Sequence, residues 1–247
     1  MFKVIESIGK YTLLMQKVFS RPEKMSIYRT RIMSEMEALG LNSIGLTAII
    51  SVFIGSAVTL QMAITLESPF IPQFMIGYAT REVMILEFSS TVVALILAGK
   101  VGSNIASEIG TMRITEQIDA MEIMGVNSAN YLILPKIVAF MVMMPLLVTL
   151  SMFMGLLGGY GISAITNVLP ISEYLLGIQY AFIPFYVWYS FIKTVIFAFV
   201  IASMASYYGY YARGGALEVG KASTKAVVNS SIVILLLDVV LTNLMLN

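Results

Sequence analysis

The chain alternates long apolar stretches with short charged ones. Charged residues are absent at positions 38–66 and 137–172, and a single charge interrupts each of the windows 174–212 and 226–247. Each window holds the roughly 20 residues that a helix needs to cross a hydrocarbon layer ~30 Å thick. A fifth stretch, about 74–98, is apolar apart from three charged positions. Uninterrupted runs of this length favour helices over the alternating, roughly 10-residue strands of a membrane barrel.

The pattern therefore predicts an all-α, polytopic helical membrane protein. The expected spans are about 42–66, 74–98, 137–161, 185–208 and 226–246. Composition agrees, because 58% of the residues are hydrophobic, 12% are charged and the mean hydropathy is +0.88, outside the range of soluble domains. We expect one domain over 1–247, with interfacial elbow helices in 1–40 and the five-span region in 41–247.

The first 20 residues predict an amphipathic helix that precedes the spans. Apolar residues recur there at helical spacing, while Lys3, Lys10 and Lys17 form a separate basic stripe. Pro22 ends this pattern, and a second stripe follows in 25–36. Such helices lie in the headgroup region. Two interpretations stay open: an elbow that orients the first span, or a lateral gate that touches substrate.

The basic residues predict the orientation of the chain. Thirteen of the 15 lysines and arginines precede span one or lie between spans two and three or four and five. Loops rich in lysine and arginine stay in the cytoplasm. The N-terminus is therefore expected to be cytoplasmic and the C-terminus external.

The chain contains neither cysteine nor histidine. This excludes disulfides, thiol nucleophiles, imidazole bases and the usual zinc, haem and iron–sulfur ligands. We expect no catalytic residue and no metal site. The run from Gly215 to Lys221 resembles a phosphate-binding loop, but Ala222 stands where that motif needs a hydroxyl for magnesium. If nucleotide drives this protein, another chain must bind it.

Three ionisable residues fall at membrane depth, where a lone charge is costly. Lys193 and Asp238 are expected to be structural and to pair, which would fix the register of two helices. Glu87 is followed by Phe88 and by hydroxyl residues, so it is a candidate for contact with a lipid headgroup, with structural pairing as the alternative. Gly155 and Gly159 form a GxxxG spacing that permits close helix contact in span three.

A charged segment rich in small residues, 97–126, separates spans two and three. A water-soluble helix held between two membrane spans most commonly docks a soluble partner. The expected docking helix covers about 105–125. Its candidate contacts are Glu108, Met112, Arg113, Glu116, Gln117, Asp119, Met121 and Glu122, with Ile123 and Met124 as further apolar contacts.

Six ordered segments carry a resemblance to a known family. They are 39–43 (LGLNS), 53–61 (FIGSAVTLQ), the loop 97–126, 193–197 (KTVIF), 211–228 and 238–242 (DVVLT). In this order and at these separations they resemble the MlaE-type permeases, the membrane subunits of ABC transporters that move phospholipid between bacterial membranes. The likeness runs from the elbow to the C-terminus.

One motif departs from the family pattern. The family has an Arg-Glu-Leu-Gly-Pro run before the signature loop, and counting back 13 residues from Lys100 gives Glu87 the acidic place. Leu86 stands in the place of the arginine, and Ser89 and Ser90 in the places of Gly-Pro. This departure suggests a divergent branch of the family and leaves open whether the headgroup is handled as in the family.

The resemblance implies a function and its partners. The chain would be a multi-pass permease of the bacterial inner membrane, not itself an enzyme, working as a homodimer with a cytoplasmic ABC ATPase that binds the ATP. An external MCE (mammalian cell entry) lipid-binding protein would exchange phospholipid with it, and nucleic acid would have no role. A lipid cavity would lie between two copies, with Leu60, Gln61, Glu87 and Phe88 as its expected lining.

Three other functions compete with this interpretation. A secondary transporter or channel predicts internal repeats and a series of intramembrane polar groups, which the sequence lacks. A membrane enzyme acting on lipid would have to rely on a serine–lysine pair. A passive scaffold of a multiprotein complex is compatible with the residues but leaves the intramembrane charges without a purpose.

Overall fold

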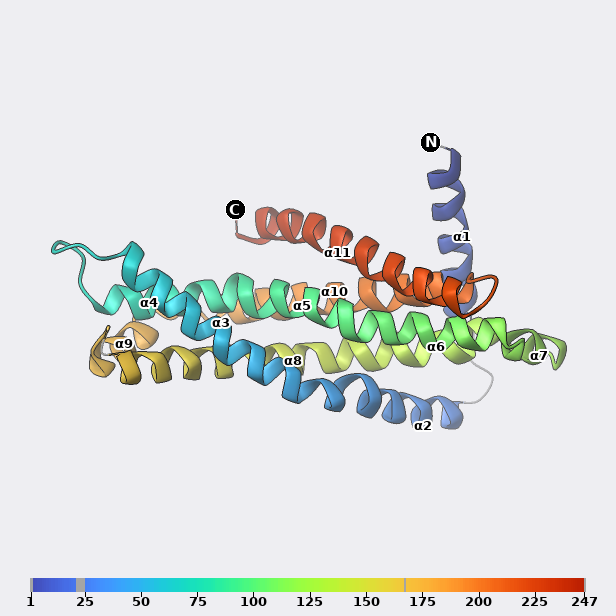
Figure 1. The fold of residues 1–247 in the computed structure, drawn as a ribbon, viewed down its shortest axis with the longest axis horizontal. Helices are drawn as coiled ribbons and strands as arrows, with labels where there is room; N and C mark the ends of the chain where they lie inside the picture. Colours follow the sequence, from blue (N-terminus) through green and yellow to red (C-terminus); the bar gives the residue numbers. More distant parts are fainter. Residues whose placement is uncertain (1, 21–24, 167, 247) are drawn as a thin grey trace. The chain divides into compact units, whose positions relative to one another are not determined.

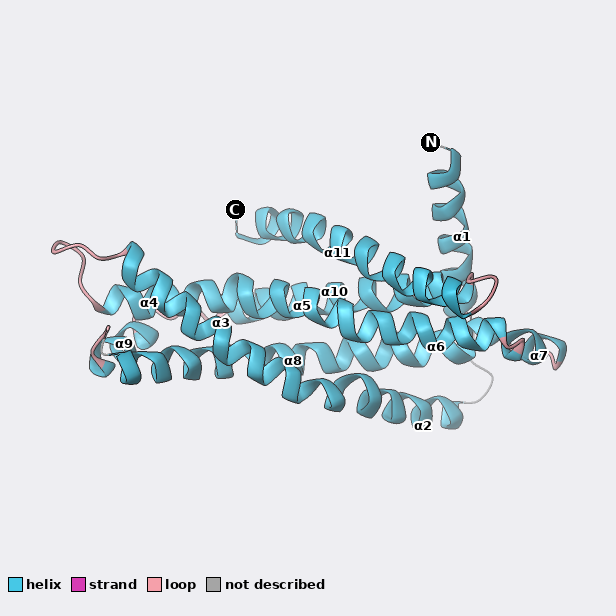
Figure 2. Cartoon of the chain, viewed as in Figure 1, coloured by secondary structure: helices cyan, strands magenta, loops and turns pink. Residues whose placement is uncertain are grey.

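The computed structural model describes residues 2–20, 25–166 and 168–246. Every regular element within these ranges is a helix (Figure 2). The all-α, membrane-type fold expected from the apolar windows is confirmed, because five helices are long and apolar enough to cross a membrane.

The helices follow one another with short connections (Figure 1). They are α1 (Phe2–Val18), α2 (Met25–Glu35), α3 (Ile44–Thr65), α4 (Phe74–Val83), α5 (Val93–Leu97), α6 (Ser103–Ile114), α7 (Gln117–Ile123), α8 (Ser128–Thr166), α9 (Ile171–Gln179), α10 (Phe185–Tyr210) and α11 (Ala216–Leu246). A short 3-10 turn, η2 (Leu41–Ser43), precedes α3, and three π-helical segments lie between α-helices: η1 (Met36–Gly40), η3 (Met84–Val92) and η4 (Ala98–Gly102). Such wide turns are rare and occur frequently at functional sites.

The five candidate spans extend beyond the limits expected from charge. They cover Tyr28–Thr65, Phe74–Ile114, Ser128–Thr166, Phe185–Tyr210 and Ala216–Leu246. A helix keeps its backbone hydrogen bonds after it leaves the hydrocarbon, so charged residues mark the membrane boundary and not the end of the helix. The second elbow stripe therefore continues into the first spanning helix, and the docking helix continues the second.

The chain divides into two compact units. Unit 1 comprises Met1–Leu41, Leu95–Met143 and Ile196–Val240, and unit 2 comprises Asn42–Ala94, Met144–Val195 and Leu241–Asn247. The limits of the units fall inside α5, α8, α10 and α11, so the same helices contribute residues to both.

In unit 2, α3 and α8 pack with their backbones in contact. A Cβ atom added to Gly55 would overlap the carbonyl of Gly155, and one added to Gly158 would overlap the carbonyl of Val52, so neither helix has room for a side chain at these positions. Two hydrogen bonds join the same helices: the hydroxyls of Ser51 and Ser151 are 2.8 Å apart, and Ser56 donates to the carbonyl of Gly158 at 2.9 Å. The close contact expected from the glycine spacing is confirmed. Small residues and hydroxyls replace the hydrophobic effect, which is weak between helices in lipid.

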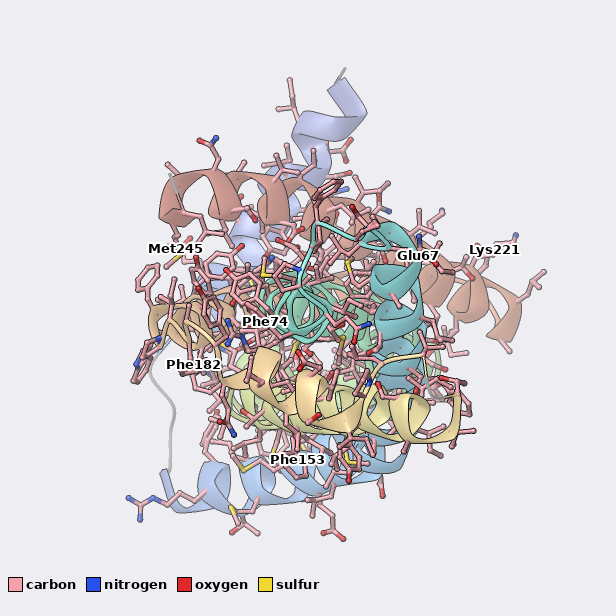
Figure 3. All side chains as sticks on the ribbon, turned by 90° about the vertical axis from the view of Figure 1, so that its left-hand side faces the viewer. Glu67, Phe74, Phe153, Phe182, Lys221 and Met245 are labelled. Carbon is pink, nitrogen blue, oxygen red and sulfur yellow. The ribbon has the colours of Figure 1, made fainter. Side chains whose placement is uncertain are left out.

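At one end of unit 2, Arg81 joins α4 to the turn that follows α9. Its side chain is 1% exposed, and Nη1 donates to the carbonyls of Ile178 and Tyr180 at 2.7 Å each. The ring of Phe182 lies 5.5 Å from the guanidinium, and Figure 3 labels this residue. Arg81 is therefore a structural residue.

Burial in the same unit also raises the pKa of the Tyr174 phenol to about 12.

Candidate functional site

A polar cluster at the depth of the candidate spans lies in unit 2, around Glu87. Glu87 lies on η3 and Lys193 on α10, and the Lys193 ammonium is 3.0 Å from a carboxylate oxygen of Glu87. The lysine side chain is fully buried, whereas that of Glu87 is 40% exposed. A buried ammonium in this environment is stable only beside an opposite charge or several acceptors.

Backbone and hydroxyl groups complete this cluster. Lys193 also donates to the carbonyl of Leu86 at 3.2 Å and to the phenol oxygen of Tyr189 at 3.1 Å. Thr91 and Thr242 donate to the two Glu87 carboxylate oxygens at 3.3 and 3.4 Å. The Glu87 cluster, defined as Glu87, Thr91, Tyr189, Lys193 and Thr242, is a polar network with one carboxylate partly open to its surroundings.

The cluster brings together residues that sequence reasoning had kept apart. Glu87 was expected to contact lipid and Lys193 to pair with Asp238, but the structure places Lys193 directly against Glu87. Asp238 belongs to unit 1, so its pairing with Lys193 stays a prediction. Tyr189 was missed, although its position four residues before Lys193 puts both side chains on one face of a helix.

The other expected lipid contacts lie on nearby elements of unit 2. Leu60 and Gln61 are on α3, where Leu60 is half-buried and Gln61 is exposed. The Gln61 amide donates to the hydroxyl of Thr65 at 3.4 Å. Phe88, beside Glu87 on η3, is half-buried. A shared lipid cavity lined by Leu60, Gln61, Glu87 and Phe88 stays a prediction.

In unit 1, several residues expected to dock a partner are held by the chain itself. Glu108 on α6 lies 2.8 Å from the ammonium of Lys136, a residue of α8 that is 2% exposed. The same ammonium is 2.7 Å from Glu35 on α2. Lys136 thus joins α2, α6 and α8 through two ion pairs.

The short helix α7 is tied to its surroundings at both ends. Arg113 on α6 is 2.7 Å from Asp119 on α7. Farther along α7, Glu122 accepts hydrogen bonds from Tyr210 at 2.8 Å and from Ser128 at 3.0 Å. The hydrogen bond from the Tyr210 phenol lowers the pKa of Glu122, against the opposing effect of partial burial.

The outer surface of α7 carries exposed apolar side chains. Ile123 is 87% exposed and Met124 is 71% exposed, while Met112 and Met121 are half-buried. Gln117 and the residue before it, Glu116, are exposed as well. Large apolar side chains exposed beside a charged surface mark interaction sites.

The turn between α6 and α7 is strained. Glu116 has φ +60°, in the left-handed region that residues other than glycine rarely adopt. Strain of this kind costs on the order of 1–3 kcal/mol and persists where the surrounding structure requires it. Here the Arg113–Asp119 ion pair spans the turn and holds it in place.

The N-terminal helix α1 and the segment after it pack against the rest of unit 1. Tyr11 donates to Ser203 on α10 at 2.9 Å, and its ring meets that of Tyr207 edge to face. The side chain of Asn130 donates to the carbonyls of Val18 and Ser20. The break expected at Pro22 lies outside the described residues. These contacts agree with an elbow, and the choice between elbow and gate stays open.

The run that resembles a phosphate-binding loop forms the turn before α11 and the first turns of that helix. Lys221 lies 2.6 Å from Glu218, within the same helix. The preceding element is the helix α10, whereas a phosphate-binding loop follows a strand.

Comparison with known proteins identifies related chains. The sequence profile of the family described as Permease MlaE matches residues 32–244. A probable ABC transporter permease protein of Rickettsia bellii is 33% identical over 98% of this chain and 93% of its own length. A similar protein of Synechocystis is 32% identical over 89% of this chain and 83% of its length. The protein TRIGALACTOSYLDIACYLGLYCEROL 1 of Arabidopsis thaliana chloroplasts is 27% identical over 92% of this chain and 65% of its length.

Proposed function

The chain belongs to the MlaE permease family, and we propose that it is the permease subunit of an ABC-type transporter that moves phospholipid. Lipid passes between the bacterial inner membrane and an external MCE lipid-binding protein. A separate cytoplasmic ATPase supplies the energy, and this chain itself has no catalytic role. Support for a lipid as cargo comes from the Arabidopsis relative, which carries the name of a galactolipid.

One observation carries the proposal of coupling between ATPase and lipid. A single candidate span, Phe74–Ile114, contains both Glu87 of the polar cluster and Glu108 of the Lys136 ion pairs. The same segment leads directly into α7 with its exposed Ile123. Nucleotide-driven closure of the ATPase pushes on α7, and its ties to Arg113 and Tyr210 pass that movement into α6 and α10.

The Glu87 cluster is the proposed contact for a lipid headgroup. Its hydroxyl groups can donate or accept hydrogen bonds. A polar headgroup atom can therefore replace Glu87 or Lys193 as the hydrogen-bond partner of a hydroxyl without leaving a buried group unpaired. Leu60, Gln61 and Phe88 supply the neighbouring surface for the glycerol and acyl chains. Leu86, in the place of the family's arginine, makes this headgroup site less cationic than the family pattern, and Ser89 and Ser90, in the places of Gly-Pro, add hydroxyl groups.

A second copy of the chain encloses the lipid. The support is α11: only 11% of its most apolar 18-residue stretch is buried inside the chain. The corresponding share is 50% in the spans Phe74–Ile114, Ser128–Thr166 and Phe185–Tyr210. A helix with so little burial leaves a long apolar face for lipid or for another protein chain.

The double variant Ile123→Glu/Met124→Glu tests the proposed docking of the ATPase. It removes the exposed apolar contacts of α7 and leaves the Arg113–Asp119 and Glu122–Tyr210 ties intact. We expect a loss of about 2 kcal/mol or more of association, because exposed apolar anchors at an interface carry energies of this size. ATPase co-purification and ATP-driven lipid transfer should both fall by more than tenfold.

Phe70→Glu is the matched control. Phe70 is 94% exposed and lies in the connection between spans one and two, whereas α7 lies between spans two and three. Consecutive connections of a spanning chain lie on opposite membrane faces, so this variant should keep the ATPase. Retention of both ATPase and transfer by the Ile123/Met124 variant would refute docking at α7.

A further inference from the structure

Two adjoining pockets in unit 1 lie outside the sites described above. The first is an apolar cavity of about 270 Å³ where α1 meets α10 and α11, lined by Ile8, Tyr11, Met204 and Val233 among others (Figure 1). The second is a polar cavity of about 310 Å³ at the turn between α10 and α11. Tyr207 and Tyr208 line both cavities, so the apolar one continues into the polar one.

The polar cavity is basic. Arg213, Lys221 and Lys225 line it together with one carboxylate, that of Glu218. Lys221 is neutralised by Glu218 at 2.6 Å. Arg213 and Lys225 are exposed and make no ion pair within the described part of the chain, although the charge of Lys225 also lowers the pKa of Glu218. Three cations therefore share one carboxylate at this cavity. Figure 3 shows Lys221 extending from the edge of the helix.

The first helix brings a further cation close to this cavity. The 2.6 Å hydrogen bond from Lys10 to Glu6 raises the pKa of Lys10, and the positive charge of Arg213 acts in the opposite direction. Lys10 and Arg213 are therefore within electrostatic range of each other. Because Glu6 neutralises Lys10, the unbalanced positive charge stays at the α10–α11 turn.

The basic cavity lies at the level expected for a membrane surface. The spans expected from charge end at about 208 in α10 and begin at about 226 in α11, so the basic cavity lies at the expected membrane boundary. Tyrosines gather at this level, since positions 207, 208, 210 and 211 are all tyrosine. Aromatic residues of this kind concentrate at the membrane–water interface, where one end of the ring is apolar and the other is wet.

We propose that the two pockets form one binding site for an anionic phospholipid. An acyl chain occupies the apolar cavity between α1, α10 and α11, and the phosphate lies among Arg213, Lys225 and the phenols of Tyr207 and Tyr208. This lipid is a structural ligand that fastens α1 to α10 and α11. The site belongs to unit 1, separate from the Glu87 cluster of unit 2, and it does not depend on phospholipid being the transported cargo.

The combination of cavities selects this ligand. Free phosphate or a nucleotide would use the basic cavity and leave the apolar one empty. A zwitterionic phospholipid would fill the apolar cavity and bring a phosphate, but its own ammonium group would lie beside Arg213 and Lys225 and be repelled by them. The hydroxyls of Tyr207 and Tyr208 make no side-chain hydrogen bond to the part of the chain that the structure describes, so both are available to phosphate oxygens.

The test uses the full chain in its purified assembly, delipidated and supplied with phosphatidylglycerol or phosphatidylcholine. Native mass spectrometry measures the lipid bound. We expect Arg213→Gln/Lys225→Gln to weaken phosphatidylglycerol binding on the order of tenfold. Each basic residue beside an anionic headgroup adds a favourable electrostatic contribution to binding, and this variant removes two of them. Phosphatidylcholine, whose choline cation offsets its phosphate, should bind more weakly to the wild type and lose less in this variant. Lys17→Gln/Arg29→Gln, which removes two exposed charges that line neither cavity, is the matched control.

A second measurement reports on this site alone. Because the chain has no cysteine, Ser7→Cys introduces a single thiol at the wall of the apolar cavity. Phosphatidylglycerol should slow its reaction with a maleimide several-fold, and the Arg213/Lys225 variant should abolish that protection. Cargo lipid held at the Glu87 cluster would not protect residue 7 from the maleimide. A protein that has lost transport and a protein that has lost this site therefore differ in thiol protection.

Two outcomes would overturn the proposal. One is equal phosphatidylglycerol binding and equal thiol protection in wild type and in the Arg213/Lys225 variant. The other is unchanged lipid binding with reduced ATPase co-purification, which would make the basic cavity a surface for an acidic protein segment.

Discussion

Each unit buries a lysine, and the two lysines are surrounded differently. In unit 1, Lys136 is 2% exposed and lies between two carboxylates, Glu35 at 2.7 Å and Glu108 at 2.8 Å. These carboxylates come from α2 and α6, so one ammonium fastens two helices to α8. Carboxylates only accept hydrogen bonds, and both pairs are close to ideal length. We interpret this arrangement as a brace.

In unit 2, Lys193 is fully buried and its environment includes hydroxyl groups. Its ammonium is 3.0 Å from Glu87 and 3.1 Å from the phenol of Tyr189. Thr91 and Thr242 reach the same carboxylate at longer distances of 3.3 and 3.4 Å. Hydroxyls change between donor and acceptor by rotation, so this cluster can admit another polar group. The comparison separates a fixed structural link from a site that can bind a ligand.

The largest expected effect comes from removing both carboxylates of the brace. Glu35→Ala/Glu108→Ala leaves Lys136 buried without a counter-ion, which should cost about 3 kcal/mol of unfolding free energy. Each single substitution should cost only about 1 kcal/mol, because the other carboxylate still pairs with the lysine. Thermal unfolding of the four proteins in one detergent gives the coupling energy. Glu37→Ala, at an exposed carboxylate two residues from Glu35, is the control and should change stability little.

A strictly additive result would contradict the brace. If the double variant lost no more than the sum of the single ones, Lys136 would not depend on its two carboxylates jointly. The distinction between the two lysines would then have no energetic basis.

A smaller effect is expected from pH at the end of α7. The folded-state pKa of Glu122 lies below the ordinary value of 4.5, so its ionised form stabilises the fold. This contribution is fully present above pH 4.5 and is lost as the pH falls through the lowered pKa. Tyr210→Phe removes the main hydrogen bond, so it should lower the unfolding temperature at pH 7.

The difference between wild type and Tyr210→Phe should therefore shrink in acid. Other acid-sensitive groups affect both proteins equally and cancel in the comparison. Tyr160→Phe, at a partly exposed tyrosine of α8, should show no such pH-dependent difference. A difference for Tyr210→Phe that stays constant from pH 7 to below 4.5 would exclude ionised Glu122 as its cause.

The number and type of spanning helices were predictable, and their ends were not. Charge-free windows such as 137–172 hold at least the roughly 20 residues that one span needs, so each predicts a spanning helix. The helices continue past these windows into charged flanks, as in α8, which begins at Ser128, includes Pro135 and runs to Thr166. Close contact at Gly155 was also predictable, because glycine spacing within one helix exposes its backbone.

The candidate site was predictable only in part. Polar neighbours singled out Glu87, but 106 positions separate it from Lys193, and the sequence offered Asp238 as an equally plausible partner for that lysine. In the docking segment, sequence could not separate charges that face a partner from those that tie the chain together, such as Glu108 and Asp119. The left-handed turn at Glu116 had no signal, because glycine is absent from that position.

Lipid retained by two matched variants tests the central claim most directly. Glu87→Gln and Glu35→Gln each remove one negative charge beside a buried lysine. Native mass spectrometry of the purified assembly measures bound phospholipid, with ATP-driven lipid transfer assayed in parallel. Glu87→Gln should lose several-fold in cargo lipid and transfer while keeping the ATPase, and Glu35→Gln should keep all three. Unchanged lipid and transfer in Glu87→Gln, or an equal loss in both variants, would contradict the account.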